Sequence, residues 1–372
     1  MACSAPRAVP RPIQNGPFVS DSPQLDQRQH DQISVSFVLP VLNERRHLRA
    51  AVESALGQQG LAAREVILVV GRNTDGTDQI VAELDAEYPE VVVVRNPRNA
   101  ISRAMNLGTA AARHPVIIRV DAHSVLPDDY AVRAVSTLRR VGAVNLGGRM
   151  LASGTTRFER AVAWAYNSAV GLGGAVYHVG SEPGPAESAY LGVFDKNALV
   201  EIGGFDESIN RGEDWELNYR FRQRDQLVWY EPDLEVLYRP RSNLPALAKQ
   251  FYASGRWRGE LIRRLGTWRP LRYFAPPLLV LGLLLSLVTL AAGLPLAVSL
   301  HPAWWIAVGA AFVVPGVYGG WLLVVTAFAR EETGAVKRRM LIVLPVMHVC
   351  WGWGCLLGLI VRQRGAGGLH GR

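Results

Sequence analysis

Short apolar runs alternate with amphipathic segments through the first third of the chain. Runs rich in β-branched residues stand at 33–39, 65–70, 91–95 and 116–120. Between them, apolar residues recur at near-helical spacing, most clearly in 48–56 and 102–112. Continuous apolar strands that alternate with such helices predict an α/β fold, with a buried, mainly parallel sheet covered by helices on both faces.

The pattern is less regular after residue 140. It predicts strands over 143–148, 190–194, 227–230 and 235–238, and helices over 158–172, 197–202 and 213–224. Residues 173–185 are rich in Gly, Pro, Ser and Glu and indicate a loop. Ligands of parallel sheets bind at the carboxyl ends of the strands. The polar residues that follow each predicted strand are therefore the candidates for a site.

Three long apolar segments occupy the C-terminal part of the chain, at about 275–298, 304–328 and 341–361. None contains Asp, Glu, Lys or Arg. Each approaches the ~20 residues that a helix needs to span a bilayer. The sequence therefore predicts a bundle of three transmembrane helices over 274–362. The polar termini, 1–31 and 363–372, are predicted to be a disordered tail and a short C-terminal tail.

The net charge of +8 is unevenly placed, since residues 239–272 hold nine Lys or Arg and one acid. A basic block of this kind binds nucleic acid or an anionic membrane surface. Its position before the first apolar segment favours the membrane and excludes nucleic acid as the partner. We expect 241–273 to be a basic amphipathic segment at the membrane interface.

The links between the apolar segments also differ in charge. Residues 299–302 carry no Lys or Arg, whereas 329–339 carry four. The excess of Lys and Arg on cytoplasmic loops then predicts a multi-pass protein of the cytoplasmic (inner) membrane. The α/β domain would lie on the cytoplasmic side and the C-terminal tail outside.

Four polar clusters stand at predicted strand ends. The first holds Pro40, Asn43 and Glu44, which are able to read a base or ribose or simply to cap a helix. The second holds Gly71, Asn73 and Asp75, where a glycine turn lets a ligand approach the backbone. An ordinary turn and helix cap explains this second cluster equally well.

The third cluster is Asp121 and His123, two residues apart at the end of a strand. A carboxylate and a neutral imidazole suit Mn²⁺ well and Mg²⁺ less well. Two protein ligands leave room for diphosphate oxygens. The fourth cluster is Glu213 and Asp214, whose mutual repulsion raises a proton affinity and makes one a useful base. A helix N-terminus opposes that effect, and simple charge placement at a helix start is the alternative.

Together these clusters resemble family 2 glycosyltransferases of the GT-A fold, most of all the membrane-anchored bacterial branch that builds exopolysaccharide repeat units. The resemblance rests on an ordered set of short motifs within about 33–270. These are Val38-Leu39-Pro40-Val41-Leu42-Asn43-Glu44, Asn73-Thr74-Asp75-Gly76-Thr77, Ala104-Met105-Asn106-Leu107-Gly108, Val120-Asp121-Ala122-His123, Gly203-Gly204-Phe205-Asp206 and Glu213-Asp214-Trp215-Glu216-Leu217-Asn218.

The resemblance implies a GT-A catalytic domain over 32–240 and a role for each cluster. Pro40, Asn43, Glu44, Gly71, Asn73 and Asp75 would line the nucleotide pocket, with Arg103 and Asn106 near the diphosphate. Asp121 and His123 would occupy the metal-binding DxD position. Asp214 would be the catalytic base and Glu213 would shape the acceptor side, where Arg256 and Trp257 also belong.

Three residues depart from the family pattern and affect the expected donor, metal site and mode of synthesis. Val70 stands where the family often has an Asp that binds uracil. A UDP-sugar is still the favoured donor, but the support comes from the family resemblance and not from this position. His123 replaces the last acid of the metal motif. Ala253 stands at the Gln position of the Gln-x-x-Arg-Trp motif, which argues against a processive polymer synthase.

The function expected is inverting transfer of a sugar from a nucleotide diphosphate sugar to a hydroxyl of a lipid-linked saccharide. One alternative is transfer to polyprenyl phosphate itself. Another is a catalytically inactive, membrane-bound scaffold that binds sugar nucleotides. Sugar transfer requires the carboxylates of Asp121 and Asp214 to converge in one crevice.

Overall fold

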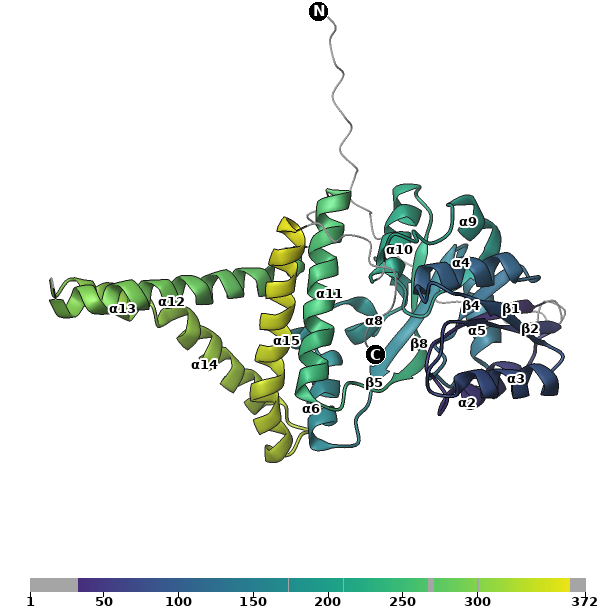
Figure 1. The fold of residues 1–372 in the computed structure, drawn as a ribbon, viewed down its shortest axis with the longest axis horizontal. Helices are drawn as coiled ribbons and strands as arrows, with labels where there is room; N and C mark the ends of the chain where they lie inside the picture. Colours follow the sequence, from purple (N-terminus) through teal and green to yellow (C-terminus); the bar gives the residue numbers. More distant parts are fainter. Residues whose placement is uncertain (1–32, 173, 210, 267–270, 300, 362–372) are drawn as a thin grey trace, which may run out of the picture.

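The computed structural model describes residues 33–172, 174–209, 211–266, 271–299 and 301–361. One sheet of eight strands forms the centre of its α/β domain (Figure 1). The predicted tails, 1–31 and 363–372, lie outside the described residues. The strands are β1 (Ser34–Val41), β2 (Ala63–Val70), β3 (Val91–Arg95), β4 (Val116–Arg119), β5 (Asn145–Ala152), β6 (Gly184–Pro185), β7 (Val193–Asp195) and β8 (Val228–Tyr238). Their order in the sheet is β3-β2-β1-β4-β7-β5-β8-β6.

The sheet is mainly parallel, as the apolar runs predict. Strands β1, β2, β3 and β4 pair in parallel, and so do β5 and β8. Strand β7 runs antiparallel to both β4 and β5 and joins the two parallel groups. The carboxyl ends of β1, β2 and β4 therefore meet at one edge of the sheet.

Helices cover both faces of the sheet. One face packs against α2 (Leu48–Leu56), α3 (Thr77–Glu87) and α5 (Tyr130–Val141). The other packs against α4 (Ile101–Ala111), α9 (Lys196–Glu201) and α10 (Glu213–Gln223). Helix α5 is not among the elements predicted above, although Tyr130, Ala134 and Leu138 lie at helical spacing on its buried face.

The predicted helix over 158–172 is two helices, α6 (Arg157–Tyr166) and α7 (Ala169–Leu172). The break lies at Asn167, whose side-chain amide accepts from the backbone nitrogen of Ala152 and donates to its carbonyl, at 3.0 and 2.8 Å. These bonds tie the end of α6 to β5. The predicted loop over 173–185 contains the short helix α8 (Val176–Val179) and the edge strand β6, so it is partly regular.

The two closing strands predicted over 227–230 and 235–238 are one strand, β8, with an irregular middle. Its pairing with β5 shifts register, so that Gly148 pairs with Glu231 and Arg149 with Glu235. Pro232 lies in the skipped stretch and has no N–H for the ladder. The gap predicted between two strands, at 231–234, therefore corresponds to a bulge within the single strand β8.

The C-terminal part consists of α11 (Leu244–Leu265), a 3₁₀ turn (Leu271–Phe274), α12 (Ala275–Ser299), α13 (Trp304–Ala310), α14 (Val313–Phe328) and α15 (Gly334–Ile360). Within the described residues, three helical stretches are long and apolar enough to cross a membrane: Leu271–Ser299, Trp304–Phe328 and Gly334–Ile360. The second is interrupted between α13 and α14, and the third begins earlier than predicted, at Gly334.

Helices α11 and α15 lie side by side between the α/β domain and the other apolar helices (Figure 1). Glycines let their backbones touch. A Cβ added at Gly255 or Gly259 of α11 would stand 2.0 or 2.2 Å from carbonyl oxygens of α15. One added at Gly354 or Gly358 of α15 would meet α11 carbonyls at 2.2 and 2.1 Å. Small residues at such positions permit close helix packing.

Candidate active site

The guanidinium of Arg119, the last residue of β4, binds three carboxylates from two parts of the chain. Its Nη1 donates to both carboxylate oxygens of Asp214, at 2.7 and 2.8 Å, and to Oε1 of Glu213 at 3.3 Å. Its Nη2 donates to Oδ1 of Asp121 at 3.3 Å. Arg119 is buried, with 6% of its surface exposed. The expected convergence of Asp121 and Asp214 therefore takes place around one cation.

Asp214 reaches this point because α10 begins beside the end of β4. Gly212 precedes the helix with φ +77°, a left-handed conformation that glycine adopts without strain. Burial raises the pKa of Asp214 to about 7, and the negative charges of Glu213 and Asp121 add to the rise, while Arg119 opposes it. A carboxyl with this pKa takes up and releases a proton near neutral pH.

The loops after β1 and β2 hold each other through Asn43, Asn73 and Thr74. The backbone nitrogen of Asn43 donates to Oδ1 of Asn73 at 2.7 Å, and that of Thr74 donates to Oδ1 of Asn43 at 2.8 Å. Asn43 has φ +57°, which asparagine tolerates better than most residues. The two predicted clusters at these strand ends thus form one structure.

Other polar residues of these two loops form hydrogen bonds within the loops themselves. Asp75 accepts from the backbone nitrogen and hydroxyl of Thr77, at 3.0 and 2.6 Å, and from the backbone nitrogen of Arg45 at 3.2 Å. A Cβ at Gly71 would lie 2.7 Å from Oδ1 of Asn99, so glycine permits a close approach of the chain to itself. Pro40 lies inside β1 and pairs with Val69.

Arg103 and Asn106 of α4 contact the chain segment that follows α9. Arg103 forms an ion pair with Glu207 at 3.0 Å. The side-chain amide of Asn106 donates to the carbonyl of Phe205 at 2.9 Å and accepts from its backbone nitrogen at 2.8 Å. In this structure Asn106 holds the Gly203-Gly204-Phe205-Asp206 turn against α4, and Arg103 holds the next residue, Glu207.

A large cavity, of about 2460 Å³, connects the carboxylate cluster to the apolar helices. Its polar end is lined by residues that follow β1, β2 and β4 and begin α10: Asn43, Glu44, Arg72, Thr74, Asp121, His123, Glu213 and Asp214. Pro40, Gly71, Asn73, Asp75, Arg103 and Asn106 are not among its lining residues. Of the predicted nucleotide-site residues, the structure therefore brings only Asn43, Glu44 and Asp121 to the cavity wall.

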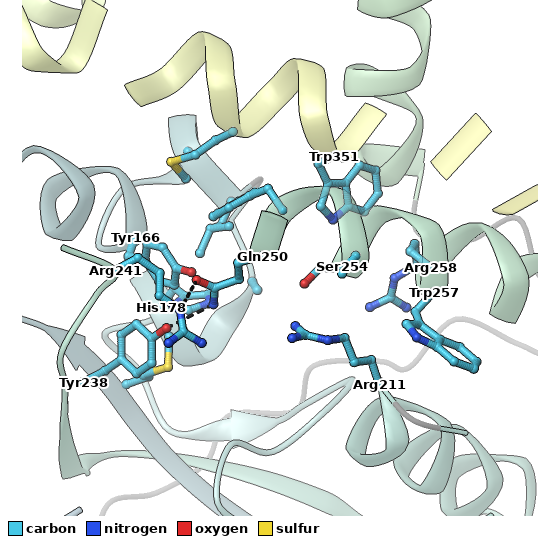
Figure 2. Close-up of a pocket in the computed structure, with 18 of the residues that line it drawn as sticks. Tyr166, His178, Arg211, Tyr238, Arg241, Gln250, Ser254, Trp257, Arg258 and Trp351 are labelled. Atoms are coloured by element: carbon cyan, nitrogen blue, oxygen red, sulfur yellow. Dashed lines mark hydrogen bonds between the residues drawn. The ribbon is translucent and has the colours of Figure 1, made fainter. Parts of the chain in front are cut away.

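The middle of the cavity is lined by aromatic and basic side chains (Figure 2). Tyr166, His178 and Tyr238 come from α6, α8 and β8, and Ser254, Trp257 and Arg258 come from one face of α11. Trp257, predicted for the acceptor side, thus lines the cavity. Arg256 is not among the lining residues, because its turn of α11 packs its backbone on Gly358 of α15.

Comparison with known proteins agrees with this arrangement. The profile of glycosyl transferase family 2 matches residues 36–205. The succinoglycan biosynthesis protein ExoA of Rhizobium meliloti is 32% identical over 281 residues, which cover 73% of this chain and 85% of that protein. This chain belongs to glycosyl transferase family 2. A second relative, from Methanococcus voltae, is 22% identical over 62% of this chain and 74% of its own length. Its name is dolichyl N-acetyl-alpha-D-glucosaminyl phosphate 3-beta-D-2,3-diacetamido-2,3-dideoxy-beta-D-glucuronosyltransferase.

The fold of this family 2 member is GT-A. A mannosyltransferase of Pyrobaculum calidifontis, solved with GDP-Man and Mn²⁺, superposes with a TM-score of 0.56 over 88% of each chain. The sequence identity is 14%, so the likeness concerns the fold. The family and fold predicted from the motifs are confirmed.

The GT-A fold implies a divalent metal beside the donor diphosphate, and Asp121 and His123 offer suitable donor atoms. Nδ1 of His123 lies 3.1 Å from Oε1 of Glu44, which orients the ring. Among the described residues, no group of three or more His, Cys, Asp or Glu side chains is arranged to hold a metal alone. A carboxylate and an imidazole fit a cation whose other ligands are substrate oxygens.

Two residues of this family 2 site were not assigned a role from the sequence. Arg119 directly precedes the quoted Val120-Asp121-Ala122-His123 motif, and its position at the end of a buried strand, two residues before Asp121, was a usable signal. Arg258 lies one residue beyond the predicted Arg256-Trp257 pair. Helical spacing from Ser254 would have placed Arg258, and not Arg256, on the same face as the cavity.

Proposed function

We propose that this chain is an inverting, metal-dependent glycosyltransferase. It moves a sugar from a nucleotide diphosphate sugar to a hydroxyl of a lipid-linked saccharide during synthesis of a cell-surface polysaccharide. The observation that carries the proposal is the set of contacts of Arg119 with Asp121 and Asp214 at the polar end of the cavity. The name of the 32% identical relative, a succinoglycan biosynthesis protein, supports the pathway class.

Asp214 is the proposed base. The acceptor oxygen forms a bond to the anomeric carbon while the bond from that carbon to the diphosphate breaks, and the acceptor proton passes to a carboxylate oxygen of Asp214. Burial raises the pKa of Asp214 to about 7, so its conjugate acid is formed readily in the transfer step. Arg119 holds both carboxylate oxygens and so fixes the direction of the base.

Asp121 and His123 are the residues proposed to hold Mn²⁺ or Mg²⁺, which when bound would neutralise charge on the departing diphosphate. Asn43, Glu44 and Thr74 line the same end of the cavity and are proposed to contact the nucleoside. Glu213 is proposed to shape the acceptor side, next to the base.

The proposed location is the cytoplasmic membrane, with the α/β domain on the cytoplasmic side. The apolar helices supply the membrane attachment. The basic link at 330–339 contacts α6 through the ion pair of Glu332 with Arg160, and the basic helix α11 lies next to the α/β domain (Figure 1). Both agree with the usual excess of Lys and Arg on cytoplasmic segments.

Sugar transfer by purified protein in detergent tests the proposal, with Asp214→Asn as the variant and Asp225→Asn as the control. Asp225 is exposed and has φ +56°, a conformation that asparagine also adopts. Asp214→Asn should lower transfer by about 10²–10⁴-fold. Stabilisation by nucleotide sugars with Mn²⁺, screened across UDP- and GDP-sugars, should persist. Near-normal transfer by Asp214→Asn would exclude Asp214 as the base.

A further inference from the structure

Arg258 of α11 presents a guanidinium to the cavity, and no carboxylate of the described residues forms an ion pair with it. The group lies between two aromatic rings, 4.4 Å from the ring centre of Trp215 and 4.1 Å from that of Tyr273. Its Nη1 is buried and has no hydrogen-bond partner, and no ion pair of the described residues includes Arg258. Stacking fixes the cation in place but leaves its N–H groups unsatisfied.

Two further arginines line the same region. Arg211 stands directly before the glycine that begins α10, and Figure 2 shows it close to Arg258 and Trp257. Arg272 also lines the cavity and bonds to Glu187. Glu187 pairs with Arg272, whereas no ion pair of the described residues includes Arg258, so the charge argument rests on Arg258. Guanidinium groups gathered in this way favour an anion with several oxygens, above all a phosphate.

Beyond these cations the cavity wall becomes apolar. Leu279 of α12 and Val313, Val317 and Trp321 of α14 continue it onto helices that could cross a membrane. A ligand that fills both regions carries a phosphate and a long apolar chain. A free phosphate or a soluble sugar phosphate would use only the first region.

We propose that Arg258, with Arg211 and Arg272, binds the phosphate or diphosphate that joins the acceptor saccharide to its lipid. This inference rests on the proposed function and names the part of the acceptor that the site recognises. Trp215, on which Arg258 stacks, directly follows Asp214 in α10. The phosphate subsite is therefore attached to the element that carries the base.

The test compares one saccharide on two lipids, a polyprenyl diphosphate and an uncharged alkyl chain. Arg258→Gln should lower kcat/KM for the diphosphate acceptor by about 10–100-fold, the effect of losing a charge-assisted hydrogen bond, with little change for the neutral acceptor. Arg263→Gln is the matched control, since Arg263 lies on α11, pairs with Glu260 and is not among the residues that line the cavity. Equal losses with both acceptors would overturn the proposal.

Two further measurements separate the possible sources of the phosphate. The KM for the donor should stay unchanged in Arg258→Gln, and a raised donor KM would assign Arg258 to the donor diphosphate instead. Polyprenyl phosphate should raise the melting temperature of the wild type more than that of Arg258→Gln, whereas inorganic phosphate should not. If the protein transfers no sugar at all, the proposed function fails, and this binding measurement still decides the subsite.

A different observation, the direction of the helices, carries a second inference. In Figure 1, α12 points away from the α/β domain and is steeply inclined to α15. Helices α11 and α15 lie between α12 and the α/β domain. Val336, Met340 and Val343 of α15 pack in one cluster with residues of α6 and β5. Both halves of α15 therefore lie against the catalytic domain or its basic helix α11.

A membrane that α15 crossed would also contain α11 and α6. Helix α11 carries Lys249, Arg256, Arg258, Glu260, Arg263 and Arg264, and charged groups at the centre of a bilayer are costly. In contrast, α12 and α14 contain no Asp, Glu, Lys or Arg and expose Leu285, Val288, Leu323 and Val324. Of the described apolar helices, only α12, α13 and α14 can therefore enter the bilayer core without carrying charged parts of the catalytic domain or of α11 into it.

We infer that α12 and α13–α14 form a two-span hairpin, while α11 and α15 lie along the membrane surface. The exposed Ile342, Trp353 and Ile360 of α15 then face lipid. The chain end returns to the side of the catalytic domain, opposite to the expectation from three spans.

A reporter fused to the C-terminus of the full chain tests this topology. Alkaline phosphatase should be inactive and a fluorescent protein bright there, as in the cytoplasm. The same reporters inserted after Pro302, between α12 and α13, should give the opposite result. An active phosphatase at the C-terminus would establish three spans and overturn the inference.

Discussion

Nη1 of Arg119 lies 2.7 and 2.8 Å from the two carboxylate oxygens of Asp214, although 95 positions separate these residues in the chain. The bond joins the end of β4 to the start of α10. Because Arg119 is buried, its charge is poorly screened by solvent, and so are the carboxylates around it. Burial by itself would lower the pKa of Arg119, but Asp214, Asp121 and Glu213 outweigh it and raise that pKa.

Removal of the Arg119 charge should destabilise the fold as well as stop transfer. Arg119→Met would leave Asp121, Glu213 and Asp214 near one another without a cation, which should cost about 3–5 kcal/mol of unfolding free energy. Thermal unfolding in detergent measures this. Arg95→Gln is the control, since Arg95 forms an exposed pair with Asp78 that should contribute about 0–1 kcal/mol. Equal stabilities of the two variants would contradict the role given to Arg119.

Transfer should rise with pH through about 7, because the base must be ionised and the pKa of Asp214 is raised to about 7. Stability should change in the opposite direction. The folded protein holds the Asp214 proton more tightly than the unfolded chain, so this contribution is present at low pH and lost as pH rises through about 7. The pH profile of kcat/KM is the measurement, and a profile flat across that range would argue against Asp214 as the base.

Mn²⁺ removal and substitution of His123 should weaken donor binding without unfolding the protein. A chelator should abolish the stabilisation by nucleotide sugar, and His123→Ala should raise the Mn²⁺ concentration required by about tenfold or more. Thermal shift reports this without turnover. The control is His301→Ala in the link after α12, far from the site in the sequence and in the fold. An unchanged Mn²⁺ requirement in His123→Ala would remove His123 from the metal site.

Alanine at Gly255 or Gly358 should lower the melting temperature. An added Cβ would stand 2.0 and 2.1 Å from backbone carbonyl oxygens of the facing helix, so α11 and α15 would have to separate. Helix propensity acts the other way, since alanine is favoured over glycine by about 1 kcal/mol in a helix. Gly309→Ala is the control, because an added Cβ there meets nothing within 4 Å. Stabilisation at all three positions would show that α11 and α15 are not tightly packed.

Local patterns were enough to predict much of the fold. Strand β3 lies where the apolar run placed it, and β1, β2 and β4 differ by a few residues at their ends. Buried parallel strands are continuous in hydrophobicity, so their pattern survives without tertiary information. Two of the errors fall where a tertiary contact or a proline interrupts an element: at Asn167, which binds β5, and at Pro232, which lies in the bulge of β8.

The sequence alone determined the family, the order of the motifs and the existence of apolar helices, because these depend on residue types and on spacing along the chain. Only the tertiary structure decided which side chains share one space. It joined Asp121 to Asp214 through Arg119 and turned Arg258, not Arg256, to the cavity. It also directed Asp75 to Thr77 in its own loop and Asn106 of α4 to Phe205. Such contacts follow from packing between segments far apart in the chain, which no local pattern of residues records.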